Sequence, residues 1–273
     1  MSLGWCLFYR CTSREIFFRK MEIVGVIPAR FASTRLPGKP LLSDTGRPLI
    51  AHVVEAARRA RSLERILVAT DDPRIAQAVR DHGGEAVMTR ADHPTGTDRV
   101  AEVATALTDA RIIVNLQGDE PEIQGATIDR LVELLASDPE APMATLAAPI
   151  TDPAIHRDPS CVKVVFDARG RALYFSRAPI PFQRDPGGRE PGATLGWLHL
   201  GIYAYRRDFL LSLARLPQSP LESAEKLEQL RVLEAGFPIA LAVVDEPSIG
   251  VDTPLDYQRF VERYRAEDSN RRA

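Results

Sequence analysis

Short apolar runs alternate with longer amphipathic segments through most of the 273-residue chain, and this alternation is the strongest constraint on its fold. EIVGVI (22–27) and RILVAT (65–70) have the length and the β-branched content of buried strands. Between them, PLIAHVVEAARRAR (48–61) repeats apolar residues at helical spacing. Buried strands separated by such helices are typical of a parallel sheet with both faces covered. The sequence therefore predicts an α/β fold with a doubly wound, mostly parallel sheet.

The pattern changes after about residue 143. KVVFDARGRALYFS (163–176) predicts two antiparallel strands joined by a turn at Gly170. A Gly/Pro-rich loop follows at 183–196. We therefore expect residues 160–205 to form a β-rich insertion within one domain.

Two helices are predicted towards the C-terminus. ESAEKLEQLRVLEAG (222–236) has one continuous helical pattern that ends at a glycine. The last helix follows GVDTP, where Asp252 or Thr253 is placed to cap it and Pro254 to open it. We expect the domain to span residues 21–265.

Residues 1–20 do not share this pattern. Their apolar part is interrupted by Arg10 and Arg14, and no small-residue cleavage site follows. We interpret them as an N-terminal extension outside the folded core, with a short docked helix as the alternative.

Composition excludes several classes of function. A formal net charge of -2 argues against a nucleic-acid coat, which needs a basic surface. No apolar run approaches the ~20 residues that span a bilayer, so no membrane insertion is expected. The three cysteines, Cys6, Cys11 and Cys161, show no metal-ligand spacing and suit a reducing cytoplasm.

The first strand runs into a basic loop, IPARFASTRLPGKPL (27–41), which holds Arg30, Arg35 and Lys39 and no acid. Ligands of open parallel sheets bind at the carboxyl ends of the strands, where this loop is expected. Three cations at that edge would suit a polyphosphate. A solvated basic loop is the alternative that the loop alone leaves open.

Neither named phosphate-binding motif is present. A Walker loop ending at Gly38-Lys39 would need glycine at position 33 and serine or threonine at position 40, where this chain has Ser33 and Pro40. No G-x-G-x-x-G occurs either. Phosphates would therefore be held mainly by side chains.

Carboxylates follow two other predicted strands. VNLQGDEP places Asp119 and Glu120 just beyond a buried run, and GVDTPLD places Asp252 before the last helix. Oxygen ligands beside a polyphosphate suit Mg²⁺, which keeps several waters. A turn acid at Asp119 and a helix cap at Asp252 are the alternatives when each is taken alone.

Several motifs together resemble the 3-deoxy-manno-octulosonate (Kdo) cytidylyltransferase family, also called CMP-Kdo synthetases. The resemblance covers about residues 23–260, with the motifs in family order: IPARFASTRLPGKPL, TRADHPTGTDR, VNLQGDEP, KVVFDARGRALYFSR, HLGIYAYR, PLESAEKLEQLRVLEAG and GVDTPLD. It implies a nucleotide-diphospho-sugar transferase-like fold, with the β-rich insertion serving sugar binding and dimerisation. It also implies the reaction of CTP with Kdo to give CMP-Kdo and pyrophosphate, for lipopolysaccharide synthesis in the cytoplasm.

The resemblance also implies roles for individual residues. The catalytic set would be Arg30, Lys39, Asp119 and Asp252, with the two aspartates as Mg²⁺ ligands. Nucleotide-binding residues would be Arg30, Arg35, Lys39, Arg90, Gly96 and Thr97. Sugar-binding residues would be Gln117, Arg177, His199, Tyr203, Glu228 and Gln229, with the Arg177 cation suited to the Kdo carboxylate.

Some of these roles depend on the resemblance alone. A lone histidine that begins an apolar strand, as His199 does, is often structural, and Glu228 and Gln229 fall in mid-helix, where they would be ordinary surface residues. The chain departs from the family at Leu255, where relatives often have an acid, and the loop at 183–196 does not align.

Other functions stay open at this stage. Within the reaction class, the acceptor could be 8-amino-Kdo or a sialic-acid type of sugar. A non-catalytic nucleotide-binding module would need fewer acids than Asp119 and Asp252 supply. A glycosyltransferase that uses a finished sugar nucleotide would not need the Arg30 and Lys39 pair. The family further suggests a homodimer.

Overall fold

The computed structural model describes residues 22–32, 36–184, 192–245, 247 and 249–272. The described residues form one sheet of nine strands. The strands are β1 (Glu22–Ala29), β2 (Arg65–Thr70), β3 (Glu85–Met88), β4 (Ala110–Asn115), β5 (Met143–Ile150), β6 (Lys163–Phe166), β7 (Ala172–Ser176), β8 (Gly196–Arg206) and β9 (Ile239–Val243). The predicted N-terminal extension lies outside the described residues, so its status remains a prediction.

Helices fill most of the connections. They are the 3-10 turn η1 (Lys39–Leu41) and the helices α1 (Leu49–Ala57), α2 (Pro73–Asp81), α3 (Gly96–Ala106), α4 (Gly125–Ser137), α5 (Pro153–Arg157), α6 (Arg207–Leu213), α7 (Pro220–Glu225), α8 (Gln229–Glu234) and α9 (Pro254–Arg272). None of the helices in the described ranges is long and apolar enough to cross a membrane.

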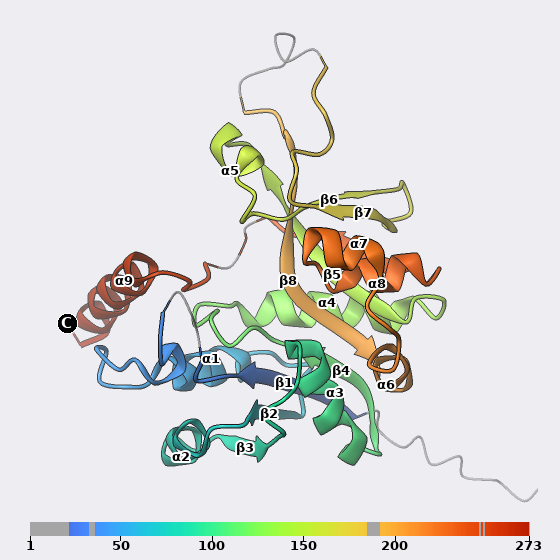
Figure 1. Cartoon of the computed structure of the whole chain (residues 1–273). Helices are drawn as coiled ribbons and strands as arrows, with labels where there is room; N and C mark the ends of the chain where they lie inside the picture. The colour runs from blue at the N-terminus through green and yellow to red at the C-terminus, as the bar shows by residue number, and fades with distance from the viewer. Residues whose placement is uncertain (1–21, 33–35, 185–191, 246, 248, 273) are drawn as a thin grey trace, which may run out of the picture.

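The main path of the sheet has the order β3-β2-β1-β4-β8-β5-β9. β3, β2, β1 and β4 pair in parallel, as do β5 and β9, while β8 is antiparallel to both of its main-sheet neighbours. Figure 1 shows β8 running across the molecule between these two parallel groups. The predicted α/β fold with a mostly parallel sheet is confirmed.

Two hydrophobic layers cover the faces of the sheet. One combines strand residues such as Ile27 with Ile50 of α1, Ile75 of α2 and Leu131 of α4. The other brings together residues of α3, α6 and α8, including Val100, Leu210 and Leu230. Because both faces are covered, strand residues are apolar on both sides, and β1 and β4 therefore appear in the sequence as continuous apolar runs.

The β-rich segment begins with the predicted hairpin. β6 and β7 are antiparallel, and Gly170 turns between them with a φ of 72°. A Cβ atom at Gly170 would also lie 2.7 Å from the Leu241 carbonyl oxygen. Both the positive φ and this close approach therefore favour glycine at the position. Figure 1 shows this hairpin and the described residues that follow it, 177–184, projecting from the main sheet.

The segment predicted as an insertion also supplies a central strand. The first half of β8 pairs with β6 and β5, and its second half lies between β4 and β5. The register of β8 against β5 shifts between Thr145 and Leu146, which allows one long strand to pair both with the hairpin strand β6 and with the main-sheet strand β4. The insertion is therefore built into the sheet.

The single helix predicted over residues 222–236 is wrong. The chain forms α7 and α8 there, and Lys226 between them has φ 56° and ψ 47°. A left-handed residue interrupts the hydrogen-bonding pattern of a helix even where hydrophobic spacing continues, so the periodicity did not reveal the break. The break moves Glu228 from mid-helix to the beginning of α8.

Candidate active site

A cation bridges the two aspartates that follow the sheet. Lys39 Nζ donates to Asp119 Oδ2 at 2.7 Å and to the Val251 carbonyl oxygen at 2.9 Å, and it lies 3.3 Å from Asp252 Oδ1. The Lys39 side chain is only 13% exposed, against 30% for Asp119 and 46% for Asp252. Three loops that are distant in sequence therefore meet at one sheet edge, as predicted.

Glycine permits this close approach. A side chain at Gly118 would lie 2.8 Å from the Pro28 carbonyl oxygen, so only glycine lets the loop after β4 lie against the end of β1. On the other loop, Gly38 has φ 67° and its N–H donates to the Phe31 carbonyl oxygen. These two contacts bring Asp119 and Lys39 into reach of each other.

Thr253, and not Asp252, caps the last helix. Thr253 Oγ1 accepts from the Asp256 N–H at 3.2 Å, and Asp256 Oδ2 accepts from the Thr253 N–H at 2.8 Å. This reciprocal pair satisfies free N–H groups at the beginning of α9. The Asp252 carboxylate is thereby left to face Lys39.

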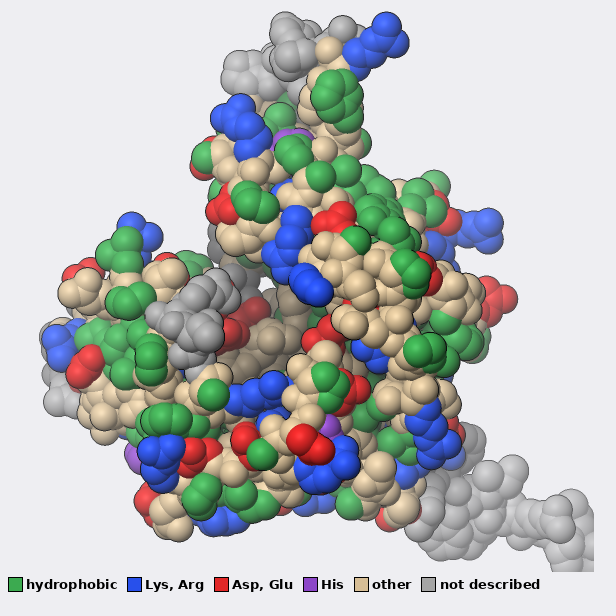
Figure 2. Space-filling model, in the orientation of Figure 1, with side chains coloured by type: hydrophobic (Ala, Val, Ile, Leu, Met, Phe, Trp, Pro, Cys, Tyr) green, Lys and Arg blue, Asp and Glu red, His purple; other side chains and the backbone are tan. Residues whose placement is uncertain are grey.

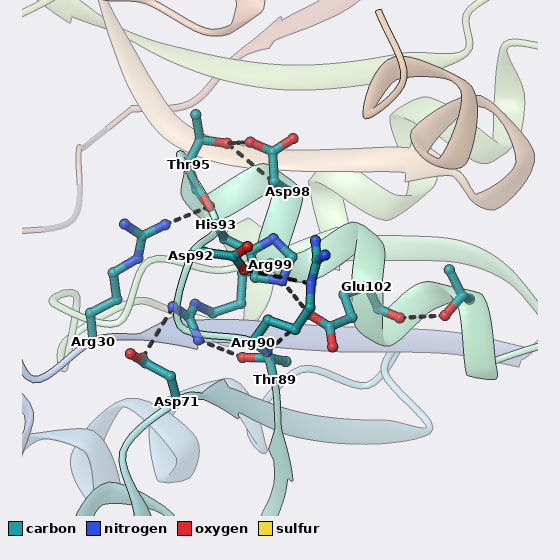
Figure 3. A network of polar contacts seen from close by, with 11 residues as sticks. Arg30, Asp71, Thr89, Arg90, Asp92, His93, Thr95, Asp98, Arg99 and Glu102 are labelled. Carbon is teal, nitrogen blue, oxygen red and sulfur yellow. Dashed lines mark hydrogen bonds and ion pairs between the residues drawn. The ribbon is translucent and has the colours of Figure 1, made fainter.

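Arg30 lies at the same edge, beside the predicted nucleotide-binding residues Gly96 and Thr97. One of its Nη atoms donates to the Thr95 carbonyl oxygen at 2.8 Å, and Figure 3 shows the side chain reaching from the end of β1 towards that residue. Gly96 and Thr97, in the first turn of α3, line the adjacent cavity. Arg35 lies outside the described residues, so its role remains a prediction.

A buried network supports this side from beneath (Figure 3). Arg99 of α3 is fully buried, and its guanidinium contacts the Thr89 hydroxyl and lies 3.1 Å from Asp71 Oδ1. Burial lowers the pKa of Arg99, an effect that the Asp71 charge opposes. The network ties α3 to the ends of β2 and β3.

Arg90 lies apart from the central cavity. Its Nε atom is 3.6 Å from Asp92 Oδ1 and 3.9 Å from Glu102 Oε2, and its side chain is 69% exposed. It lines a separate surface depression together with His93 and Arg215. The structure therefore does not bring Arg90 together with Gly96 and Thr97, and a role for it in nucleotide binding remains a prediction.

The central cavity has a volume of about 500 Å³ and is lined mostly by polar residues. Figure 2 shows this face hollowed between the projecting insertion and the sheet, with acidic side chains in the walls. Its lining contains nine of the predicted site residues: Gly96, Thr97, Gln117, Asp119, His199, Tyr203, Glu228, Gln229 and Asp252. The predicted metal and sugar residues thus share one cavity, with Arg177 excepted.

His199 is held as a neutral ring. Burial lowers its pKa to about 3, and its Nε2 lies 3.0 Å from the Thr145 hydroxyl. That hydroxyl donates to the carbonyl oxygens of Leu200 and Ile202, so the ring must donate its own N–H to Thr145. His199 Nδ1 is then the acceptor, which is a geometry for hydroxyl groups and not for an anion.

Three further side chains form hydrogen-bonding positions in the cavity wall that His199 lines. Gln117 Nε2 donates to the Gly201 carbonyl oxygen at 2.5 Å, and the Tyr203 hydroxyl donates to Gln229 Oε1 at 3.2 Å. Burial raises the pKa of Tyr203 well above its usual value, so the hydroxyl stays protonated. Gln229 is 4% exposed, and its Nε2 has no partner among the described residues. A buried donor of this kind at a cavity surface is suited to a ligand oxygen.

Glu228 reaches the same wall through the helix break. Burial raises its pKa, and hydrogen bonds from Thr97 and Thr95 partly offset that effect. Glu228 therefore connects α8 to the first turn of α3, where the predicted nucleotide residues lie. Without the break at Lys226, the same side chain would fall in a continuing helix.

Arg177 makes only backbone contacts with its guanidinium. Nε donates to the Glu225 carbonyl oxygen at 2.8 Å, Nη1 to that of Pro159 at 2.9 Å and Nη2 to that of Lys226 at 3.4 Å. It is absent from the cavity lining among the described residues. Arg177 therefore braces the rim of the cavity and does not enter it.

Comparisons with known proteins identify the family of the chain. Residues 24–242 match a family model described as cytidylyltransferase. The chain is 53% identical over 243 residues to the 3-deoxy-manno-octulosonate cytidylyltransferases of Syntrophotalea carbinolica and Syntrophobacter fumaroxidans, covering 88% of this chain and 97% and 96% of theirs. The chain belongs to the 3-deoxy-manno-octulosonate cytidylyltransferase family.

A solved structure is also similar. It is that of CMP:2-keto-3-deoxy-manno-octonic acid synthetase complexed with CTP, with a TM-score of 0.84 and 46% identity over 90% of this chain and 99% of that one. A cytidylyltransferase structure from Leptospira borgpetersenii, at 19% identity and a TM-score of 0.58, shares the fold.

Several cavity residues were not predicted from the sequence. Asn115 is 2% exposed, lines the cavity, and its Oδ1 has no partner among the described residues. A polar residue that ends the apolar run RIIVN was the signal available. Ser160, Cys161 and Lys226 also line the cavity, but they come from a loop and a helix break that hydrophobic patterns do not mark.

The aspartate pair fits a divalent cation. Within the described ranges, no cluster of three or more His, Cys, Asp or Glu side chains is arranged to hold a metal. Asp119 and Asp252 nevertheless both lie within 3.3 Å of one ammonium group, so a cation bridges them already. Mg²⁺ is commonly bound by one or two carboxylates, with phosphate and water oxygens completing its shell. These two residues match that requirement.

Proposed function

We propose that this chain is a cytidylyltransferase that activates Kdo with CTP to give CMP-Kdo and pyrophosphate. One observation supports this most directly: Lys39 joins Asp119 and Asp252, and these two aspartates line a cavity that is also lined by a set of neutral hydrogen-bonding groups. Phosphate chemistry and sugar recognition thus meet within one space, as nucleotide transfer to a sugar requires.

The reaction joins an oxygen of the sugar to the α-phosphorus of CTP. The anomeric hydroxyl of Kdo attacks, the bond to the bridging oxygen breaks, and pyrophosphate leaves in line. Such a transfer depends mainly on positioning and charge neutralisation, so no dedicated base is assigned. Mg²⁺ held by Asp119 and Asp252 would polarise the α-phosphoryl group and lower the pKa of the attacking hydroxyl.

The chain's own cations would bind the triphosphate. Arg30 and Lys39 lie at the end of β1, and we expect Arg35 from the same loop to assist. Lys39 must exchange its aspartate contacts for phosphate oxygens when CTP binds, because a single ammonium has three donors and all three now face protein oxygens. Thr97 and Gly96 offer the beginning of α3 to the nucleotide side.

The sugar would occupy the buried wall. Gln117, His199, Tyr203 and Gln229 present neutral donors and acceptors, which suit the several hydroxyl groups of Kdo. Glu228 lies between this wall and Thr97, where it can orient a hydroxyl group close to the nucleotide. A wall of this kind recognises shape and hydrogen-bonding pattern, so we favour Kdo as the substrate.

The projecting insertion supports a homodimer. Phe182 is 85% exposed and Leu173 60% exposed, and a depression lined by Val165, Pro181 and Trp197 lies on the same insertion. Apolar surface concentrated in one segment is a common feature of contacts between subunits. A second copy of the chain is the proposed partner, and light scattering that returned the mass of a single chain would contradict it.

We place the enzyme in the cytoplasm, where it would supply activated Kdo for lipopolysaccharide synthesis.

The decisive experiment measures pyrophosphate release from each of the four nucleoside triphosphates with Kdo, with and without Mg²⁺. Of the four nucleoside triphosphates, we expect only CTP to release pyrophosphate, and only when both Kdo and Mg²⁺ are present. CTP binding without turnover would instead indicate a nucleotide-binding module. Faster release with 8-amino-Kdo would change the assigned sugar.

A further inference from the structure

The central cavity is acidic, although the proposed substrates are anions. Four carboxylate residues line it: Asp119, Glu120, Glu228 and Asp252. Among the lining residues that the structure describes, Lys226 is the one with a permanently cationic side chain, since His199 is neutral. The sugar acid of the proposed reaction carries a carboxylate that needs a counter-charge away from the phosphates. Among the lining residues that the structure describes, only Lys226 offers a fixed positive charge for this role.

Lys226 has an unusual backbone. It is the single described residue other than glycine with a positive φ, at 56°. A left-handed conformation costs a residue with a Cβ atom about 1–2 kcal/mol, and glycine would avoid that cost. A lysine retained in such a position at a cavity rim suggests a use for its side chain. Within the described ranges, no hydrogen bond or ion pair engages its ammonium group.

The turn that carries Lys226 is clamped from the insertion. Arg177 donates to the carbonyl oxygens of Glu225 and Lys226, and the Glu225 carboxylate accepts from the Arg177 N–H at 2.9 Å and from Ser176 Oγ at 2.6 Å. The third guanidinium contact holds Pro159, next to the lining residue Ser160. Each nitrogen of the Arg177 guanidinium thus holds the rim, and Arg177 is absent from the cavity lining among the described residues.

Building on the proposed function, we propose that the ammonium group of Lys226 binds the carboxylate of the sugar acid. Arg177 is then a positioning residue, which fixes the left-handed turn so that Lys226 faces the sugar. This assignment gives to Lys226 the carboxylate-binding role that the family resemblance implied for Arg177.

The test compares Kdo with its carboxamide, which has the same shape and no charge. Asparagine accepts the left-handed conformation, so Lys226→Asn removes the charge and keeps the turn. We expect Lys226→Asn to raise the KM for Kdo about tenfold, as for loss of a partly exposed ionic contact. The KM for the carboxamide and the KM for CTP should each change less than about twofold. Lys226→Arg should restore the preference for Kdo.

Matched variants separate charge from folding. Arg169→Asn removes an exposed cation at the hairpin turn, outside the cavity lining. It should leave the KM for Kdo and the KM for the carboxamide unchanged. Lys226→Gly, which favours the same backbone, should reproduce the Lys226→Asn result. The double variant Lys226→Asn/Arg177→Met should raise the KM for Kdo no more than the more impaired single variant does, because both changes act through one contact.

The outcomes distinguish the two levels of the proposal. If the unaltered protein releases no pyrophosphate from CTP and Kdo, the proposed function fails and this assignment fails with it. If the unaltered protein is active but Lys226→Asn still prefers Kdo to the carboxamide as strongly, only the role of Lys226 is overturned. In that case, a loss of preference confined to Arg177→Met would return the carboxylate to Arg177.

Discussion

The two walls of the cavity are built in different ways. The proposed phosphate wall consists of Asp119 and Asp252, which Lys39 bridges, and it comes from loops at one edge of the sheet. The proposed sugar wall, formed by His199, Tyr203 and Gln229, comes from an antiparallel strand and from the helix that begins after a left-handed turn. The first follows from fold topology, whereas the second depends on two local irregularities.

The electrostatics of the two walls differ as well. The aspartates of the phosphate wall are partly exposed and paired with a cation. In the sugar wall, burial lowers the pKa of His199 and raises that of Tyr203, so both side chains are neutral near pH 7. One wall is therefore suited to charged groups, and the other is suited to neutral hydrogen-bonding groups. This comparison leads to predictions of different size.

The largest expected effect is in the phosphate wall. Asp119→Asn and Asp252→Asn should each lower kcat by roughly 100-fold or more, since a ligand that stabilises transition-state charge is worth several kcal/mol. Stability should change little, because both side chains are partly exposed. Steady-state kinetics at saturating Mg²⁺ and thermal melts measure the two effects.

Asp256→Asn is the control for the carboxylates of this pair, because Asp256 accepts from the backbone N–H groups of Asp252 and Thr253 and has no contact with Lys39. It should lower the melting temperature and leave the Mg²⁺ dependence of kcat unchanged. Near-normal turnover by Asp119→Asn or Asp252→Asn would remove that residue from the mechanism.

A smaller effect is expected where α7 and α8 are held together. Arg231 donates to both carboxylate oxygens of Glu222 at 2.7 and 2.6 Å, and the Glu222 side chain is only 3% exposed. Breaking a buried pair by removing one partner costs about 3–5 kcal/mol. Arg231→Met should therefore destabilise the protein in urea and raise the KM for Kdo more than that for CTP. Equal changes in both KM values would show that the helix pair does not serve the sugar wall alone.

The pH dependence of stability gives the smallest effect. The pKa of His199 is about 3 in the folded chain and 6.5 as an ordinary value, so below pH 6.5 only the unfolded chain gains this proton. The resulting stability is complete above pH 6.5 and is lost as the pH falls towards 3. His199→Gln should therefore lose less melting temperature between pH 7 and pH 5 than the unaltered protein.

His52 provides the comparison for that experiment. Its pKa is lowered to about 4, mainly by burial, and it lies next to Phe260 and Tyr264 outside the cavity lining. His52→Gln should also reduce the acid sensitivity, but it should leave the KM for Kdo unchanged. An unaltered pH slope in His199→Gln would contradict the neutral, buried state assigned to that ring.

The same comparison explains what the sequence could predict. Strand periodicity placed the basic loop, Asp119 and Asp252 at one edge, because the carboxyl ends of parallel strands must meet there. It did not reveal the break at Lys226, because hydrophobic spacing continues from α7 into α8 while the backbone does not. It also did not show that β8 joins the main sheet, since an antiparallel strand has the same apolar pattern wherever it pairs.

Individual side chains were harder still to assign from sequence. Asn115 ends an apolar run and becomes a buried polar group of the cavity only once its neighbours are known. Arg177 follows a predicted strand as a motif cation, yet its partners are carbonyl oxygens from residues 159, 225 and 226. Contacts with backbone atoms distant in sequence leave no periodic signal.

The central claim is that the two walls serve different substrates, and a two-substrate kinetic matrix for Lys39→Met and Gln229→Met tests it most directly. Losing a desolvated charge contact costs about 2–5 kcal/mol, so Lys39→Met should raise the KM for CTP by roughly 30-fold or more. Its KM for Kdo should stay within about twofold. Gln229→Met should show the reverse, with the KM for Kdo raised by about tenfold through loss of a buried donor. If Lys39→Met raises the KM for Kdo as much as the KM for CTP, the division between the walls is wrong. The same holds if Gln229→Met raises the KM for CTP as much as the KM for Kdo.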